Sequence, residues 1–379
     1  ERMAASRAHV IKIAVLARDA VECLPVMRLL ERARREGRAL VALAMGEAGM
    51  WTRVVGPAHG SFLTYAAPDE EHATAPGQLT ADALVGLYRV RSINPRTQVT
   101  GIVGSPVSHS LSPHMHNAAF AAHGTDAVYL PFEVRDAGAF LRRMVSPRTR
   151  ELEWNVRGLS VTAPHKSAVL AHLDRVEPKA LKIGAVNTIV VEEWGELRGY
   201  NTDAEASLAP LDGLVELKGA QVAVVGAGGA ARAVLWALRQ RGAEATVYAR
   251  RVERAREVAE EFGASAAPLT GASFARFDVV INATPLGTRG RLEGETPAHA
   301  AQLAGARLVY DLVYNPRATR FMREGREAGC RVVGGLAMLV AQAAAQFKLW
   351  TGADAPLEVM RRAAERVLTA PSPQTPGDR

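Results

Sequence analysis

Gln221-Val222-Ala223-Val224-Val225-Gly226-Ala227-Gly228-Gly229-Ala230-Ala231-Arg232-Ala233 is the stretch that decides the fold of the second half of this chain. A short apolar run leads directly into a glycine-rich turn, and a helical pattern then continues to Arg241. A strand, a glycine-rich turn and a helix N-terminus together aim backbone N–H groups and the positive end of the helix dipole at one place, which suits a pyrophosphate. With a second strand at 245–249, the pattern predicts a Rossmann domain that binds a dinucleotide; the alternative is a tight β/α turn without a ligand.

The residues after the second strand indicate which dinucleotide binds. In an NAD site that strand ends in an acidic residue, which hydrogen-bonds the ribose 2′-hydroxyl. This chain has Ala249-Arg250-Arg251 at that point. Two adjacent guanidiniums can clamp a 2′-phosphate, so we predict NADP as the cofactor. The alternative is that both arginines belong to the solvated start of a helix.

Composition limits the classes of function. The chain has 379 residues, enough for two or three domains, and a net charge of +7. Its basic residues are dispersed among acidic ones and lack the aromatic interleaving that stacks single-stranded bases, so we expect no nucleic-acid partner. Cys23 and Cys330 show no paired spacing, and no apolar run has the length of a membrane span. We expect a cytoplasmic protein without membrane contact that binds a small anionic molecule; the oligomeric state is not predicted.

Strand-like and helix-like periods alternate along the chain, which indicates an α/β fold. We divide it into a β/α segment at 1–92, an α/β substrate-binding domain at 98–205, the Rossmann domain at 206–335, C-terminal helices at 336–368 and a disordered tail at 369–379. The first residue is Glu1, so either the natural start is Met3 or the chain is part of a longer protein.

Lysine is rare, with six lysines against 40 arginines. Because a guanidinium stays protonated, an arginine-rich chain tends to keep lysine where an amine has to react. Lys12 interrupts the apolar run 10–16, and Lys166 closes the run 159–165. Both are therefore candidate reactive groups; the alternative is a strand-end lysine whose amine reaches solvent.

Polar motifs follow the predicted strands of the substrate-binding domain. They are Gly104 to Asn117, Lys166, Gly184 to Thr188 and Gly199 to Asp203. Parallel strands carry such loops at one edge of a sheet, so these groups are placed to bind a polar ligand. Lys166 and Asp203 can act as a pair that exchanges a proton with a substrate oxygen, as transfer of a hydride from an alcohol requires; a buried salt bridge is the alternative.

Two further observations concern individual side chains of this domain and of the last helices. The histidines in the first motif, His109, His114 and His116, do not predict a metal site, because no carboxylate or thiol completes a ligand set. Gln342 lies on the apolar run 336–347, where a buried amide needs a partner. That partner is either a substrate hydroxyl or a backbone group.

Taken together, residues 99–365 resemble shikimate dehydrogenase, an enzyme of chorismate and aromatic amino acid biosynthesis. The resemblance rests on ordered motifs: Gly104 to Asn117, Val161 to Lys166, Gly184 to Thr188, Tyr200 to Asp203, Gly226 to Ala233, Asn282 to Gly287, Asp311 to Pro316 and Gly335 to Gln342. It implies NADPH-dependent reduction of 3-dehydroshikimate to shikimate, with Lys166 and Asp203 as the catalytic pair.

The same resemblance implies the remaining site residues. The substrate-binding ones are Ser110, Ser112, Thr162, Asn187, Tyr314 and Gln342, besides Asp203. Those facing the cofactor are Gly226, Ala227, Gly228, Gly229, Ala230, Arg250, Arg251, Thr284 and Met338. Three positions depart from the family pattern: Ser160 and Ala249 each replace a usual Asn, and Arg251 replaces a usual Ser or Thr.

Residues 1–90 resemble the C-terminal part of a type I 3-dehydroquinate dehydratase, a β/α-barrel lyase that uses a Schiff-base lysine. Lys12 matches that lysine, and Arg53, Ser61 and Gln78 match its substrate-binding positions. The match spans only the last β/α units, which cannot close a barrel, so we expect no dehydratase activity from this chain alone. A longer parent that joins both enzymes is the expected origin.

Two other functions stay open. One is a quinate/shikimate dehydrogenase of broader specificity, since small changes in a pocket decide between such substrates. The other is a non-catalytic sensor that resembles the fungal quinate repressor.

Overall fold

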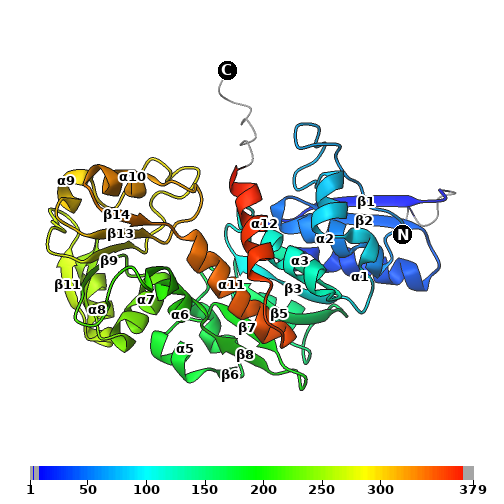
Figure 1. The fold of residues 1–379 in the computed structure, drawn as a ribbon. Helices are drawn as coiled ribbons and strands as arrows, with labels where there is room; N and C mark the ends of the chain where they lie inside the picture. The colour runs from blue at the N-terminus through cyan, green and yellow to red at the C-terminus, as the bar shows by residue number, and fades with distance from the viewer. Residues whose placement is uncertain (1–2, 4–7, 370–379) are drawn as a thin grey trace.

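The computed structural model describes Met3 and residues 8–369. Along its length lie an N-terminal segment, a central domain and a Rossmann domain (Figure 1). The expected α/β fold, in which β/α units precede a substrate-binding domain and a Rossmann domain, agrees with the three sheets of the structure. Apart from Thr369, which ends the last helix, the predicted tail lies outside the described residues.

The N-terminal segment contains one β/α/β unit. Strands β1 (Ile11–Leu16) and β2 (Leu40–Met45) pair in parallel and are joined through helix α1 (Leu24–Arg35). Helix α2 (Met50–Val55) follows, and Ser61 adds one parallel bridge to Leu40. A sheet of two strands is far from a closed barrel. One face of β1 is exposed, including Leu16, at 58%.

The central domain is built on a six-stranded sheet in the order β4-β3-β5-β7-β8-β6. Its strands are β3 (Gln98–Gly104), β4 (Ala127–Glu133), β5 (Asn155–Val161), β6 (Arg175–Val176), β7 (Thr188–Val191) and β8 (Leu197–Tyr200). The β7 strand runs antiparallel to both β5 and β8, and the other pairs are parallel. Its helices are α3 (Ser112–His123), α4 (Ala137–Phe140), α5 (Pro178–Ile183) and α6 (Asp203–Leu208).

The Rossmann domain has a fully parallel six-stranded sheet in the order β11-β10-β9-β12-β13-β14. Its strands are β9 (Gln221–Val225), β10 (Glu244–Ala249), β11 (Ser265–Pro268), β12 (Val279–Asn282), β13 (Leu308–Asp311) and β14 (Arg331–Val333). Its helices are α7 (Gly229–Gln240), α8 (Val252–Phe262), α9 (Ala300–Leu303) and α10 (Arg320–Glu327). The strand order reverses between β9 and β12, so the crevice where such sheets bind ligands lies at the end of β9.

The last two helices return to the central domain. Helices α11 (Leu336–Thr351) and α12 (Leu357–Thr369) both pack against α3 (Figure 1). Phe347 and Trp350 of α11 are buried with Phe120 of α3 and Tyr129 of β4 in one apolar cluster. This return places one face of α11 over the carboxyl ends of the central strands.

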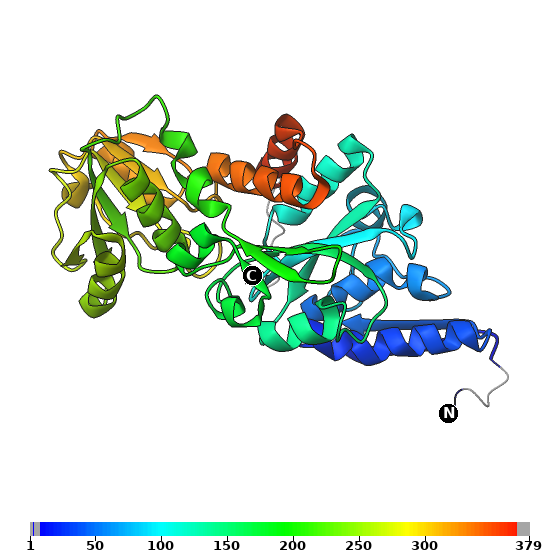
Figure 2. The same ribbon diagram turned by 90° about the horizontal axis from the view of Figure 1, so that it is seen from below.

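The N-terminal segment and the central domain share a hydrophobic core. Trp51 of α2 is fully buried, and its ring centroid lies 6.0 Å from Phe132 and 5.4 Å from Trp154. Polar contacts cross the same boundary: Arg28 pairs with Glu151, and the backbone N–H of Arg135 donates to Asp19 at 2.8 Å. Figure 2 shows this segment at the end of the molecule opposite the Rossmann domain. No helix in the described part of the chain is long and apolar enough to span a bilayer.

Candidate active site

A pocket lies between the central domain, the start of α7 and helix α11. Its lining includes every residue predicted to bind substrate or to act on it: Ser110, Ser112, Thr162, Lys166, Asn187, Asp203, Tyr314 and Gln342. These residues come from segments that span more than half of the chain. The lining also includes Ala230 and Met338, both from the predicted cofactor set.

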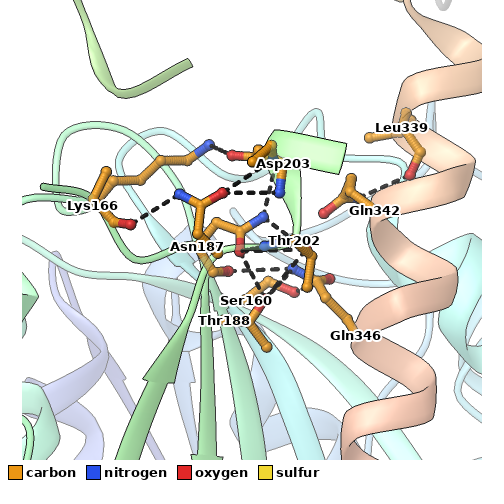
Figure 3. A network of polar contacts seen from close by, with 12 residues as sticks. Ser160, Lys166, Asn187, Thr188, Thr202, Asp203, Leu339, Gln342 and Gln346 are labelled. Atoms are coloured by element: carbon orange, nitrogen blue, oxygen red, sulfur yellow. Dashed lines mark hydrogen bonds and ion pairs between the residues drawn. The ribbon is translucent and has the colours of Figure 1, made fainter. Parts of the chain in front are cut away.

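Lys166 and Asp203 form an ion pair in this pocket, with 2.6 Å between Nζ and Oδ2 (Figure 3). The lysine side chain is 21% exposed and the aspartate side chain 6%, so the amine faces the pocket while the carboxylate lies behind it. The backbone of Lys166 is tied to the loop before β7, because its carbonyl accepts a hydrogen bond of 2.7 Å from the N–H of Val186. The amine is therefore held in a defined place.

The second oxygen of the Asp203 carboxylate is held by Asn187, whose Nδ2 donates to Oδ1 at 2.8 Å. Asn201 supports the same turn: its Oδ1 accepts from the N–H groups of Asp203 and Ala204, and its Nδ2 donates to the carbonyl of Ala185. Both carboxylate oxygens therefore have partners. The carboxylate has little freedom to turn away from the amine.

Asn187 is itself fixed by the two threonines beside it. Its Oδ1 accepts from the backbone N–H of Thr202 and from the hydroxyl of Thr188, both at 2.8 Å. Because the oxygen of the amide is committed to these donors, its NH₂ group must face Asp203. The side chain is 2% exposed, so water does not compete for these bonds.

Gln342 uses a backbone partner. Its Nε2 donates to the carbonyl of Leu339 at 2.8 Å, one turn earlier in α11 (Figure 3). The amide oxygen is left for the pocket. Of the two partners that the sequence left open, the structure thus has the backbone carbonyl.

The glycine-rich turn leaves room for a phosphate group. Gly226 has φ of 123°, a conformation that side chains rarely adopt, and a Cβ there would lie 2.8 Å from the carbonyl oxygen of Ala283. A Cβ on Gly228 would meet nothing within 4 Å, so the space beside this backbone is open. A Cβ on Gly229 would lie 3.3 Å from Cδ of Lys166, which places the turn directly against this side chain.

The other predicted cofactor residues surround this turn. Arg250 and Arg251 follow β10 and are exposed, and neither is paired with a carboxylate among the described residues. Thr284 follows β12, where its hydroxyl donates to Asn282 at 2.6 Å. An open cradle, a helix N-terminus and two free guanidiniums suit a dinucleotide with a 2′-phosphate.

Asp311 is a buried acid at the end of β13, next to the pocket residue Leu312. Burial raises the pKa of its carboxyl to about 6, and hydrogen bonds from Thr319, Val313 and Asn282 oppose that shift. Asn282 Nδ2 donates to it at 2.9 Å. This carboxyl joins the loops that follow β12 and β13.

Two pocket residues with polar side chains were missed as site residues from the sequence: Ser160, noted only as a departure from the family pattern, and Gln346. Gln346 is 1% exposed and stands four residues after Gln342 on the same apolar helix. The signal that singled out Gln342, an amide among apolar residues, was therefore present at Gln346 as well.

The four dehydratase-like residues lie in the N-terminal segment, where three of them contact different neighbours. Lys12 Nζ stands 4.2 Å from the ring centroid of Tyr65, the Ser61 hydroxyl donates to Leu63, and Gln78 accepts from Thr74. Arg53 is 3% exposed, and its Nε has no hydrogen-bond partner among the described residues. No hydrogen bond in the described part of the chain joins any two of the four.

Within residues 8–369 no group of three or more His, Cys, Asp or Glu side chains is placed to hold a metal ion. Of the histidines in the first motif, His116 is fully buried and stacks on Tyr129, with 4.4 Å between ring centroids. Burial lowers its pKa to about 3. The ring is a neutral part of the core.

Family models match almost the whole chain. They are the shikimate dehydrogenase substrate binding domain at 102–189, shikimate/quinate 5-dehydrogenase at 210–317, the shikimate 5′-dehydrogenase C-terminal domain at 335–365 and type I 3-dehydroquinase at 1–95.

Individual relatives indicate the same family as the family models. A shikimate dehydrogenase (NADP(+)) from Methanosarcina acetivorans is 43% identical over 72% of this chain and 99% of its own length. The bifunctional 3-dehydroquinate dehydratase/shikimate dehydrogenase of Arabidopsis thaliana chloroplasts is 37% identical over 94% of this chain, which spans 60% of that relative's length. A solved shikimate 5-dehydrogenase from Thermus thermophilus, in complex with NADP(H) and shikimate, superposes with a TM-score of 0.63 at 40% identity, over 72% of this chain and all of that one. The chain belongs to the shikimate dehydrogenase family.

Proposed function

We propose that this protein catalyses the NADPH-dependent reduction of 3-dehydroshikimate to shikimate. The observation that carries the proposal is the Lys166–Asp203 pair, at 2.6 Å, in a pocket lined with hydroxyls and amides and closed on one side by the glycine-rich turn. The names of the relatives from Methanosarcina acetivorans and Thermus thermophilus support the substrate and the cofactor.

The residues of this chain bind the substrate and supply the proton. NADPH, when bound, supplies the hydride that converts the C3 carbonyl carbon into a secondary alcohol carbon. The C3 oxygen then needs one proton, and the Lys166 ammonium donates it; in the oxidative direction the amine takes that proton back. Asp203 keeps the amine pointed at the oxygen, since its carboxylate is itself held by Asn187.

The remaining pocket side chains select and orient the ring. Ser110, Ser112 and Thr162 offer hydroxyls, and the oxygen of Gln342 is available because its NH₂ group is engaged with Leu339. Gly226, Gly228 and Gly229 hold the pyrophosphate of the cofactor at the start of α7, while Arg250 and Arg251 bind the 2′-phosphate. The same residues explain a preference for NADP over NAD.

The test is a comparison of Lys166→Ala with Lys182→Ala in the full chain, with the oxidation of shikimate by NADP as the assay. Lys182 is exposed on α5 and lies outside the pocket, so its variant keeps the activity of the unmodified chain. Loss of a positioned acid/base lowers kcat by about a hundredfold or more in Lys166→Ala. A Lys166→Ala variant with near-normal turnover contradicts the proposal.

Steady-state kinetics decide whether the enzyme prefers shikimate or quinate. A solved quinate dehydrogenase from Corynebacterium glutamicum superposes on this chain with a TM-score of 0.63 at 29% identity, so both substrates belong in one assay. A ratio of kcat/KM strongly in favour of shikimate supports the narrower function. Binding of shikimate without reduction of NADP would indicate a sensor.

The N-terminal segment does not act as a dehydratase in this chain, because a two-stranded sheet leaves Lys12 at an exposed face. Incubation with 3-dehydroquinate and borohydride should leave Lys12 unmodified, and modification detected by mass spectrometry would contradict this.

We also propose that the protein is cytoplasmic and that its ligands are small molecules rather than nucleic acid. The domain division given above is part of the same proposal.

A further inference from the structure

A buried tyrosine stands behind the substrate pocket. Tyr129 of β4 is fully buried and does not line the pocket. Its hydroxyl donates to Oγ of Ser160, at 2.7 Å, and Ser160 Oγ donates to Oε1 of Gln346, also at 2.7 Å. Ser160 and Gln346 both line the pocket, so the tyrosine reaches its floor through them.

The series continues from Gln346 to the catalytic pair. Its Nε2 donates to the hydroxyl of Thr188 at 3.0 Å and to the carbonyl of Asn187 at 3.2 Å (Figure 3). The Thr188 hydroxyl donates to Oδ1 of Asn187, and Nδ2 of Asn187 donates to Asp203. Every donor in this series therefore points the same way, from Tyr129 towards the Asp203 carboxylate.

The phenol of Tyr129 sets the direction of the first two hydrogen bonds in the series. Burial raises the pKa of the Tyr129 phenol, so the group keeps its proton and acts as a donor. Ser160 accepts this hydrogen bond and donates its own to the oxygen of Gln346, which leaves the NH₂ group of Gln346 to face Thr188. The carbonyl of Asn187, which can only accept, favours the same orientation of the Gln346 amide.

The ring of Tyr129 is held independently of its hydroxyl. His116 stacks on it at 4.4 Å with an interplanar angle of 10°, and Trp350 stands 6.0 Å away. Removing the hydroxyl therefore leaves the packing in place. A Tyr129→Phe variant therefore tests the hydrogen bond without changing the packing of the ring.

We propose that Tyr129 is a positioning residue: it fixes the Ser160 hydroxyl and the Gln346 amide on the floor of the substrate pocket, and through Gln346 and Thr188 it strengthens the hydrogen bonds that reach Asn187 and Asp203. Hydrogen bonds in a buried series polarise one another, so the first donor affects the last acceptor. The inference rests on the proposed dehydrogenase activity, which it extends to a residue outside the pocket.

The first experiment compares Tyr129→Phe with Tyr310→Phe in the full chain. Tyr310 is an equally buried phenol in the Rossmann domain, and its hydroxyl has no hydrogen-bond partner among the described residues. We expect kcat/KM for shikimate to fall about five- to tenfold in Tyr129→Phe, with the KM for NADP unchanged and the thermal midpoint lowered by only about 2 to 4 °C through the lost hydrogen bond. Tyr310→Phe should leave all of these unchanged.

The second experiment asks whether the effect passes through Ser160. In a Ser160→Ala background, Tyr129→Phe should have no further effect on kcat/KM, because the series is already interrupted. Gln346→Met interrupts the series one step later and serves the same purpose if Ser160→Ala does not fold. Ser112 also contacts the Tyr129 hydroxyl, so an undiminished effect in these backgrounds would assign the role to Ser112 and overturn the proposal.

An active enzyme in which Tyr129→Phe changes nothing overturns the proposal and leaves the dehydrogenase function intact. An unmodified chain without activity on shikimate instead removes the proposed function itself. The two failures are therefore distinguishable in one set of measurements.

Discussion

Replacement of Trp51 by alanine tests whether the N-terminal segment is a structural part of the dehydrogenase. Trp51 is fully buried in α2, and its ring contacts Phe132 and Trp154 of the central domain. If the two parts share one core, a cavity at Trp51 must destabilise the part that carries the active site. A segment that is merely attached would unfold alone.

The burial of Trp51 predicts a large loss of stability in the alanine variant. Truncation of a fully buried tryptophan costs about 3 to 5 kcal/mol through lost transfer energy and the cavity left behind. The free energy of unfolding of a domain is typically about 5 to 15 kcal/mol, so the change is a large fraction of the total. For a unit on the order of 200 residues this lowers the thermal midpoint by roughly 10 °C.

The assay follows urea unfolding by circular dichroism and, in the same samples, by the residual oxidation of shikimate. Both transitions should move together to lower urea in Trp51→Ala. Phe62→Ala is the matched control, because Phe62 is an aromatic residue of the same segment that is 60% exposed; its change should stay within about 0.5 kcal/mol. If Trp51→Ala leaves the activity transition in place while only part of the circular dichroism signal shifts, the shared core does not support the active site.

Three further perturbations follow from the site. Replacing Arg250 and Arg251 together by alanine should raise the KM for NADP about tenfold or more and leave that for NAD nearly unchanged, which steady-state kinetics with both cofactors measures; an equal rise for both would contradict a role at the 2′-phosphate. Burial raises the pKa of Asp311 to about 6, so the folded state favours the neutral carboxyl. The stability that this carboxyl contributes is therefore present below about pH 4 and is lost as the pH rises through 6. Relative to Asp311→Asn, the unmodified chain should lose on the order of 3 kcal/mol between pH 4 and pH 7 in urea titrations, and a constant difference would refute this. In Gly229→Ala the new Cβ would lie 3.3 Å from Cδ of Lys166, so kcat should fall about tenfold with the thermal midpoint kept, whereas an unchanged kcat would mean that the lysine is free to move.

The strand ends of the central domain were predictable because the apolar runs are short and the polar motifs follow them at once. The apolar runs 99–103, 128–132 and 156–161 correspond to β3, β4 and β5. Lys166, Asn187 and Asp203 meet in the structure because the loops at one edge of a sheet converge. The short strand β6 was not predicted, since two residues carry too little periodicity.

The sequence by itself determined the Rossmann turn, the Lys166–Asp203 pair and the family, because local chemistry and spacing suffice to identify each of them. Only the tertiary structure decided which groups Gln346 and Tyr129 contact and what covers Trp51. Periodicity shows that a side chain is buried, but the partner that it meets depends on how distant elements pack. Ser160 and Gln346 are 186 residues apart in the chain, and only the return of α11 to the central sheet brings their side chains within 2.7 Å.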